Sequence, residues 1–135
     1  METNVVFRMT DLWEPRRDDW VCQGEVPAEL GQEFRPNFFP IEQSGKSQEV
    51  VGIVGKLGKR TGASHARSML TQKDRIPTEL RGKTLVFPEH WYYTDGDNCV
   101  PTLIWAKPMV GEGPEDWQFY MDDFGFSAGD VLVLC

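Results

Sequence analysis

The stretch KTLVFPEHWYYTDGDNCVPTLIWA, residues 83–106, decides the class of fold that the sequence predicts. It contains three short runs, at 83–87, 90–93 and 100–106, that are rich in the β-branched, leucine and aromatic residues typical of strands. Asp95-Gly96 lies between the last two runs and suits the backbone conformations of a tight turn. The stretch therefore predicts strands and a β-hairpin.

Further runs of the same kind extend this pattern along the chain. They lie at residues 4–9, 19–23, 49–55 and 130–134, each bounded by Gly, Pro, Asp or Asn. Short, frequent strands of this kind are typical of antiparallel sheets, sandwiches and barrels. We expect a mainly β (α+β) fold, namely an antiparallel barrel or pseudobarrel with short helices.

One amphipathic helix is predicted near residues 115–124. Pro114 suits a first helical turn, acidic residues follow it, and Gly125 can end the helix. Its apolar face would consist of Trp117, Tyr120, Met121 and Phe124, which are spaced at i, i+3, i+4 and i+7. Shorter helical turns are predicted at 27–34, 64–70 and 76–80.

The length of 135 residues is that of one domain, so we expect a single domain over residues 1–135. Residues 1–48 would supply N-terminal strands and a loop, and residues 49–135 the candidate pseudobarrel core. Cys22, Cys99 and Cys135 form no disulfide or zinc pattern, which favours a reducing compartment. With no signal peptide or transmembrane segment evident, we expect an intracellular, cytoplasmic protein without a membrane partner.

Charge is distributed unevenly along the chain, whose formal net charge is −7. Residues 1–45 carry four Lys and Arg against nine Asp and Glu, residues 46–84 nine against three, and residues 85–135 one against nine. The central segment is thus +6, between segments of −5 and −8. Either it forms a basic binding face on an acidic body, or it folds back onto the acidic segments.

The cationic residues of the central segment begin in GIVGKLGKRTGASHARS, residues 52–68. A Walker A loop has four residues between its first glycine and Gly-Lys, followed by Ser or Thr. Here five residues separate Gly52 from Gly58, and Arg60 follows Lys59, so nucleotide hydrolysis is not indicated. The glycines also miss the dinucleotide-binding spacing. The alternatives are a phosphate-contacting segment and a solvated surface loop. The candidate ligand-binding residues are Lys56, Lys59, Arg60, His65, Arg67, Lys73 and Arg75.

No catalytic, metal or cofactor site is assigned from the sequence. The two histidines, His65 and His90, have no nucleophile or metal partner signalled by spacing. The aspartates around Gly96 fall short of a calcium loop. Five tryptophans raise the alternative of sugar stacking, although in a chain of this size some must be core residues.

Residues 75–134 resemble B3-type DNA-binding pseudobarrel domains. DWQFYMDDFGFSAGDVLVL, residues 116–134, is similar to that family in running from an aromatic segment led by Trp through glycine and Gly-Asp into a final apolar strand. RIPTELRGKTLVF, residues 75–87, resembles the family's Ile-Pro helix and the strand after it. The resemblance implies phosphate contacts in the basic stretch 52–68. The sequence departs from the family pattern at residues 107–116. Members of the family have a basic contact arm there, whereas this chain has Lys107 followed by acidic residues.

Two functions follow from these observations as hypotheses. The first is a non-catalytic domain that binds nucleic acid or a phosphate-bearing ligand through its basic central segment. The alternative is an acidic protein-interaction module, inhibitor-like or immunity-like, that caps a basic partner protein with the acidic C-terminal segment. A small enzyme with a pocket lined by Trp and His is a third class, and the oligomeric state is not indicated.

Overall fold

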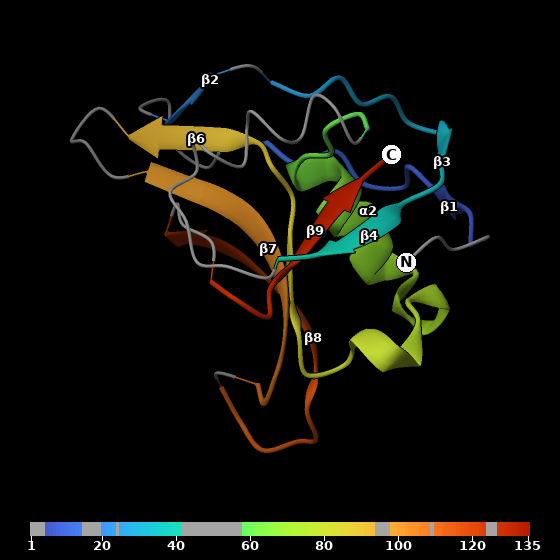
Figure 1. Ribbon diagram of the computed structural model, residues 1–135, viewed down its shortest axis with the longest axis vertical. Coiled ribbons are helices and arrows are strands. Elements are labelled where there is room, and N and C mark those ends of the chain that lie inside the picture. The colour runs from blue at the N-terminus through green and yellow to red at the C-terminus, as the bar shows by residue number, and fades with distance from the viewer. Residues whose placement is uncertain are drawn as a thin grey trace.

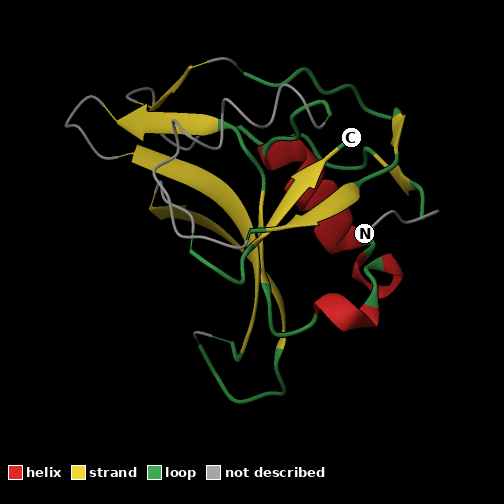
Figure 2. Ribbon diagram, viewed as in Figure 1, coloured by secondary structure: helices red, strands yellow, loops and turns green. Residues whose placement is uncertain are grey.

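A strongly curled β-sheet dominates the computed structural model, which describes residues 5–14, 20–23, 25–41, 58–93, 98–108, 110–123 and 127–135 (Figure 1). The fold is mainly β with one short helix, and the sheet forms a half-barrel (Figure 2). The strands are β1 Phe7–Arg8, β2 Trp20–Gln23, β3 Glu33–Phe34, β4 Asn37–Pro40, β5 Thr84–Val86, β6 His90–Tyr93, β7 Asn98–Ala106, β8 Asp116–Asp123 and β9 Val131–Leu134. The mainly β prediction is confirmed.

The strands of the main sheet do not follow one another in chain order. The order is β2-β6-β7-β5-β9-β4, with β8 also paired to β7, and β1 and β3 form a separate pair. β6 and β5 pair with one edge of β7: β6 pairs with the first residues of β7 and β5 with its middle. β8 pairs with the other edge, along almost the whole length of β7. The pairing of β5 with β9 is parallel and the other described pairings are antiparallel, so the sheet is mixed.

The stretch 83–106 forms β5, β6 and β7, as its composition predicts. The hairpin of β6 and β7 pairs Trp91 with Cys99, and the predicted turn at 94–97 lies outside the described residues. β2 and β9 are confirmed near 19–23 and 130–134, whereas the strand predicted at 4–9 is confined to β1. The predicted strand at 49–55 also lies outside the described residues.

Strand β9 contributes to the packing on both faces of the sheet. All four of its residues are buried, as expected of a continuous apolar run in a covered strand. Val131 and Val133 join the main core cluster, which also contains Met69 of the helix. Leu132 and Leu134 instead join a smaller cluster with Val86 and Val100. Alternate residues of one strand thus serve two separate packing layers.

Helix α2, Ala63–Thr71, packs against β7, β8 and β1 and confirms the predicted turn at 64–70. Ala66 and Met69 lie on its buried face. Two 3-10 turns follow it, η1 Lys73–Arg75 and η2 Thr78–Leu80, and the second confirms the predicted turn at 76–80. Among the described residues, no helix is long and apolar enough to cross a membrane.

The amphipathic helix predicted near 115–124 is wrong, because residues 116–123 form β8. The same sequence has apolar side chains at 117, 119 and 121, so it also fits the alternation of a strand. Pairing with a neighbouring strand decides between the helical and the strand pattern. β8 pairs with β7, with partners that include Trp105↔Trp117 and Cys99↔Asp123. Aromatic residues favour this extended conformation when a neighbouring strand is available.

The helical turn predicted at 27–34 is also wrong. Leu30 and Gly31 form a turn instead, with Gly31 at a positive φ of 85°, which interrupts any helix. The Gly31 N–H donates to Met9 O at 2.9 Å, and the Met9 N–H donates to Gln32 O at 2.7 Å. Strand β3 follows at once and pairs with β1. Contacts with the distant segment 7–9 therefore override the local helical pattern.

Candidate functional site

The basic residues at the start of the described central segment are bound to the end of β9. The Lys59 N–H donates to Cys135 O at 2.9 Å, and the Cys135 N–H donates back to Lys59 O at 2.8 Å. Lys59 itself is exposed, whereas Arg60 is half-buried and its guanidinium approaches Pro88 O at 3.5 Å. Lys56 lies outside the described residues.

Three other predicted cationic residues contact the protein's own chain. Arg67 Nε lies 3.1 Å from Asp11 Oδ2, and Arg75 donates to Val6 O at 3.0 Å. Lys73 forms an ion pair with Asp116, and this Lys73 hydrogen bond is the main reason that the pKa of the Asp116 carboxyl is lowered. At Arg67 and Lys73, the basic segment thus folds back onto acidic residues.

His65 is buried and caps helix α2. Its Nδ1 accepts a hydrogen bond from the Gly62 N–H at 3.1 Å, and its ring packs edge-on against Phe34. Burial lowers the pKa of His65 to about 4, so the ring is neutral at pH 7. A neutral, buried ring that accepts from its own backbone is a structural group rather than a phosphate ligand.

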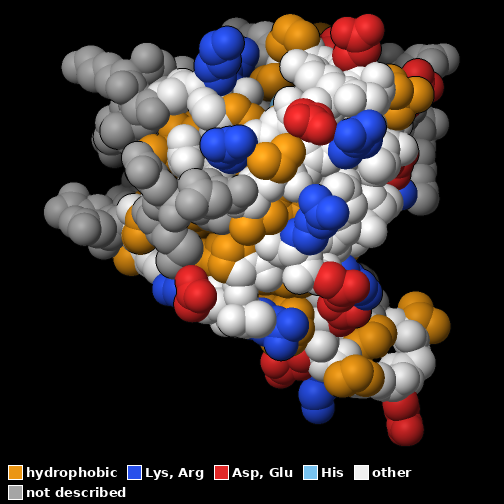
Figure 3. Space-filling view, turned by 90° about the vertical axis from the view of Figure 1, so that its right-hand side faces the viewer, with side chains coloured by type: hydrophobic (Ala, Val, Ile, Leu, Met, Phe, Trp, Pro, Cys, Tyr) orange, Lys and Arg blue, Asp and Glu red, His pale blue; other side chains and the backbone are white. Residues whose placement is uncertain are grey.

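Charges of both signs share one face of the molecule. On the face of the molecule in Figure 3, Lys and Arg side chains are interspersed with Asp and Glu. Of the two arrangements that the charge pattern allows, the structure shows internal pairing at Arg67 and Lys73.

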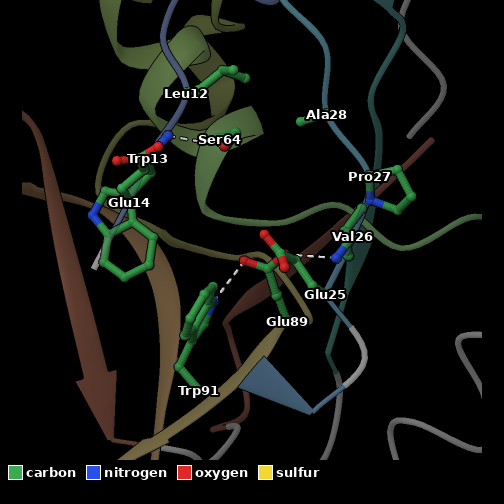
Figure 4. A pocket seen from close by; sticks show the side chains of 10 residues that line it. All are labelled: Leu12, Trp13, Glu14, Glu25, Val26, Pro27, Ala28, Ser64, Glu89 and Trp91. Atoms are coloured by element: carbon green, nitrogen blue, oxygen red, sulfur yellow. Dashed lines mark hydrogen bonds between the residues drawn. The ribbon is translucent and has the colours of Figure 1, made fainter. Parts of the chain in front are cut away.

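A different site lies where segment 11–14, segment 25–28, the start of α2 and the start of β6 meet. It is an open pocket of about 420 Å³, with acidic, indole and small apolar side chains in its wall (Figure 4). The acidic residues are Glu14, Glu25 and Glu89, and the indoles are Trp13 and Trp91. No lysine, arginine or histidine is among the described residues that line it.

Glu89 organises this pocket, although its side chain is only 3 % exposed. Its Oε1 accepts from the Ala63 N–H at 3.0 Å and from Trp91 Nε1–H at 2.7 Å. Its Oε2 accepts from the Val26 N–H at 2.8 Å. The carboxylate therefore caps the N-terminus of α2, where the helix dipole favours a negative group, and holds Trp91 and segment 25–28 in place.

Gly62 is required by this arrangement. A Cβ built at Gly62 would lie 2.3 Å from Glu89 Oε2, closer than side-chain atoms can approach. Glycine therefore lets the carboxylate reach the first turn of the helix.

Two serines of α2 position Trp13 beside the pocket. The Trp13 N–H donates to Ser64 Oγ at 3.0 Å, and the Asp11 N–H donates to Ser68 Oγ at 3.1 Å. The Trp13 ring then packs edge-on against Trp91, with centroids 4.9 Å apart and planes at 75°. A second pocket shares Leu12, Trp13 and Glu14 with the first, and its lining also includes Arg67 and Phe119.

Two glutamates of the pocket act electrostatically on a neighbouring cysteine. Burial first, then the charges of Glu89 and Glu25, raise the pKa of the nearby Cys22 thiol to about 12, against the opposing effect of Arg60. Among the described residues, the ion pairs are Arg8–Glu33, Arg67–Asp11 and Lys73–Asp116, so none involves Glu14, Glu25 or Glu89.

The described residues contain no group of three or more His, Cys, Asp or Glu side chains that could hold a metal ion. His90 Nε2 lies 2.7 Å from Asn98 Oδ1, and none of the three cysteines, which all lie within the described residues, forms a disulfide.

The chain matches no protein-family model, no curated protein and no solved structure. The resemblance of residues 75–134 to the B3 type therefore stays a prediction. The sequence indicated the tryptophans individually, but it did not predict this pocket, because the residues that line it lie far apart in the chain. The buried Glu in PEHWYY, residues 88–93, was its clearest signal, since a carboxylate between apolar strands needs a specific set of donors.

Proposed function

We propose that this protein is a non-catalytic interaction module that binds a basic partner protein. The supporting observation is the pocket in which three carboxylates and two indoles gather without a lysine, arginine or histidine among its described lining residues. This is the second of the two functions that the sequence suggests, with one change. The acidic surface it uses comes mainly from segments 11–14 and 25–28 rather than from residues 85–135.

Three acidic groups of the C-terminal segment are engaged within the molecule. Asp116 pairs with Lys73, Glu115 accepts a hydrogen bond from Trp105, and Asp130 accepts one from the Ser127 N–H. Glu14 and Glu25, in contrast, are exposed and form no ion pair with a described residue. Charges of this kind attract a complementary partner and increase its association rate.

The basic segment supports the nucleic-acid hypothesis less well. Binding to a phosphate backbone depends on several cationic side chains that can exchange counterions for phosphates. Arg67 and Lys73 would first have to break their pairs with Asp11 and Asp116. Nucleic-acid binding through Lys59 and Arg60 stays a prediction, and the binding experiment described next tests it together with the proposal.

Fluorescence anisotropy with a labelled oligoarginine peptide and a labelled DNA duplex compares the two functions directly. We expect the wild-type protein to bind the peptide in preference to the duplex at low salt. The double variant Glu14→Gln/Glu25→Gln should bind the peptide about tenfold more weakly, since each exposed charge pair contributes up to about 1 kcal/mol.

Glu29→Gln is the matched control, because Glu29 is exposed on the same segment as Glu25 but does not line the pocket. It should bind the peptide like the wild-type protein. Failure of the wild-type protein to bind the peptide would overturn the proposal. Duplex binding that is lost in Lys59→Ala/Arg60→Ala would establish the nucleic-acid function instead.

A further inference from the structure

We infer that the pocket takes one arginine side chain, whose guanidinium stacks on Trp13 and pairs with Glu25. This inference rests on the proposed function, because it names the part of a basic partner that the acidic pocket recognises. Its grounds are the size of the pocket, the arrangement of its indoles and carboxylates, and its apolar wall.

The pocket has room for a long side chain and part of the backbone that carries it. Its volume of about 420 Å³ is within the range of pockets that bind small organic groups, about 300 to 1,000 Å³. In the view of Figure 4, the two indoles stand on one side and Val26 and Pro27 on the other, with the Glu25 and Glu89 carboxylates between them. A side chain that enters here meets aromatic, apolar and acidic groups together.

The two indoles provide a surface for a flat cation. Trp91 is buried and its Nε1–H is held by Glu89, while Trp13 is half-buried. Their planes meet at 75°, so the pair forms a corner rather than a closed stack. The face of an indole attracts a cation within about 6 Å of its ring centroid, and more strongly where water is excluded.

Two carboxylates supply negative charge for a bound cation, one at the opening of the pocket and one in its wall. Glu25 is exposed and Glu89 lies within the wall. A carboxylate offers about four acceptor positions, and Glu89 uses three of them for Ala63, Trp91 and Val26. One acceptor position of Glu89 is therefore left for a donor that reaches the wall, while Glu25 is available nearer the opening.

Arginine fits this combination better than lysine. Its planar guanidinium can stack on an indole and donate hydrogen bonds to a carboxylate at the same time, whereas an ammonium group is a compact point charge. The methylene groups of its stem can lie against Val26, Pro27 and Ala28, as long cationic side chains do along apolar surfaces.

Titration with N-acetyl-arginine methylamide tests the site without a partner protein. We expect the NMR indole signals of Trp13 and Trp91 and the backbone signal of Ala28 to shift as this probe is added. N-acetyl-citrulline methylamide has the same shape without the charge and should produce no comparable shift, and the lysine analogue should bind more weakly than arginine. Equal shifts with the citrulline probe, or shifts confined to other residues, would overturn the inference.

Variants then test the site with the oligoarginine peptide. Glu25→Gln and Trp13→Leu should each weaken peptide binding about five- to tenfold. Their matched controls, Glu29→Gln and Trp105→Leu, do not line the pocket and should remain within about twofold of the wild-type protein. Thermal melting verifies that Trp13→Leu is folded, and Glu25→Gln changes only an exposed residue.

The outcomes separate the inference from the proposed function. A wild-type protein that binds the peptide, with affinities unchanged in Glu25→Gln and Trp13→Leu, would leave the interaction module standing and overturn the arginine site. A wild-type protein that binds no peptide would overturn the interaction module, and the titration with the arginine and citrulline probes would still decide whether the pocket takes a guanidinium.

Discussion

At the residue scale, Glu89 determines the local structure of the candidate site. One buried carboxylate accepts from the backbone of α2, from the backbone of segment 25–28 and from the indole of Trp91. It thereby connects three parts of the chain that are distant in sequence. Burying a carboxylate is unfavourable unless its oxygens are hydrogen-bonded, so these donors explain why Glu89 is tolerated beneath the surface.

Removing this carboxylate should destabilise the protein. Glu89→Ala leaves three N–H groups without their acceptor, of which those of Ala63 and Trp91 are buried, and each buried unsatisfied group costs roughly 1 to 3 kcal/mol. We expect a loss of at least about 2 kcal/mol in the free energy of unfolding, measured by urea denaturation. Glu79→Ala, at an exposed position of η2, should change it by less than about 0.5 kcal/mol. Similar losses in both variants would contradict the role given to Glu89.

Burial and the charges of Glu89 and Glu25 both act on the Cys22 thiol. Its pKa of about 12 means that little thiolate exists at pH 8, so alkylation by iodoacetamide should be much slower in the folded protein than in the unfolded chain. Glu25→Gln removes one of the charges that raise this pKa and should accelerate alkylation of Cys22, measured by peptide mass spectrometry. Glu29→Gln should leave the rate unchanged. A rate that is the same in all three proteins would show that Glu25 does not act on the thiol.

At the element scale, the N-terminus of α2 combines structure and candidate function. Its first turn is capped by Glu89 and His65, and its serines position segment 11–14. The first turn of α2 contacts Glu89 through Ala63 and Trp13 through Ser64. The shape of the pocket therefore depends on the helix being correctly capped. His65 gives this cap a dependence on pH.

The stability of the protein should fall as pH decreases from 6.5 to 4 through the protonation of His65. Its pKa is about 4 in the folded protein and 6.5 as a model value, so the unfolded chain binds the proton more readily in this interval. The stabilisation is complete above pH 6.5 and lost as pH falls through 4, a difference of about 2 to 4 kcal/mol.

Urea denaturation at several pH values, compared with His65→Asn, measures this contribution. Asparagine keeps an acceptor for the Gly62 N–H but does not titrate, so the variant should lose less stability than the wild-type protein between pH 6.5 and 5. The same loss in both proteins would assign the pH dependence to other groups.

At the scale of the whole molecule, the curled sheet and its helix bring distant acidic residues to one site. β2 and β4 come from the first part of the chain and pair with β6 and β9 from the last part. The segment between β2 and β3 therefore passes close to the start of β6, where it meets Glu89. The pocket gathers three of the 21 acidic residues of a chain whose formal net charge is −7.

This charge should control the rate at which a basic peptide associates. Raising the salt concentration shortens the range of electrostatic attraction to about 8 Å at physiological ionic strength. We expect the association rate constant of the oligoarginine peptide to fall about tenfold between low and physiological salt, with a smaller change in its dissociation rate constant. Stopped-flow fluorescence measures both constants. An association rate constant that does not vary with salt would contradict electrostatic steering.

The sequence by itself determined the elements whose signals are local. The apolar runs at 83–87, 90–93 and 100–106 are strands, and the segment 64–70 is helical, because composition and short-range spacing suffice there. Only the tertiary structure decided the remaining features. Residues 116–123 fit both the helical and the strand pattern of apolar residues, and they form a strand because they pair with β7. Arg67 and Lys73 form ion pairs with carboxylates that are distant in the sequence. The pocket around Glu89 needs donors from segment 25–28 and from α2, both distant from Glu89 in the sequence, and the order of residues in the chain does not state which segments will meet.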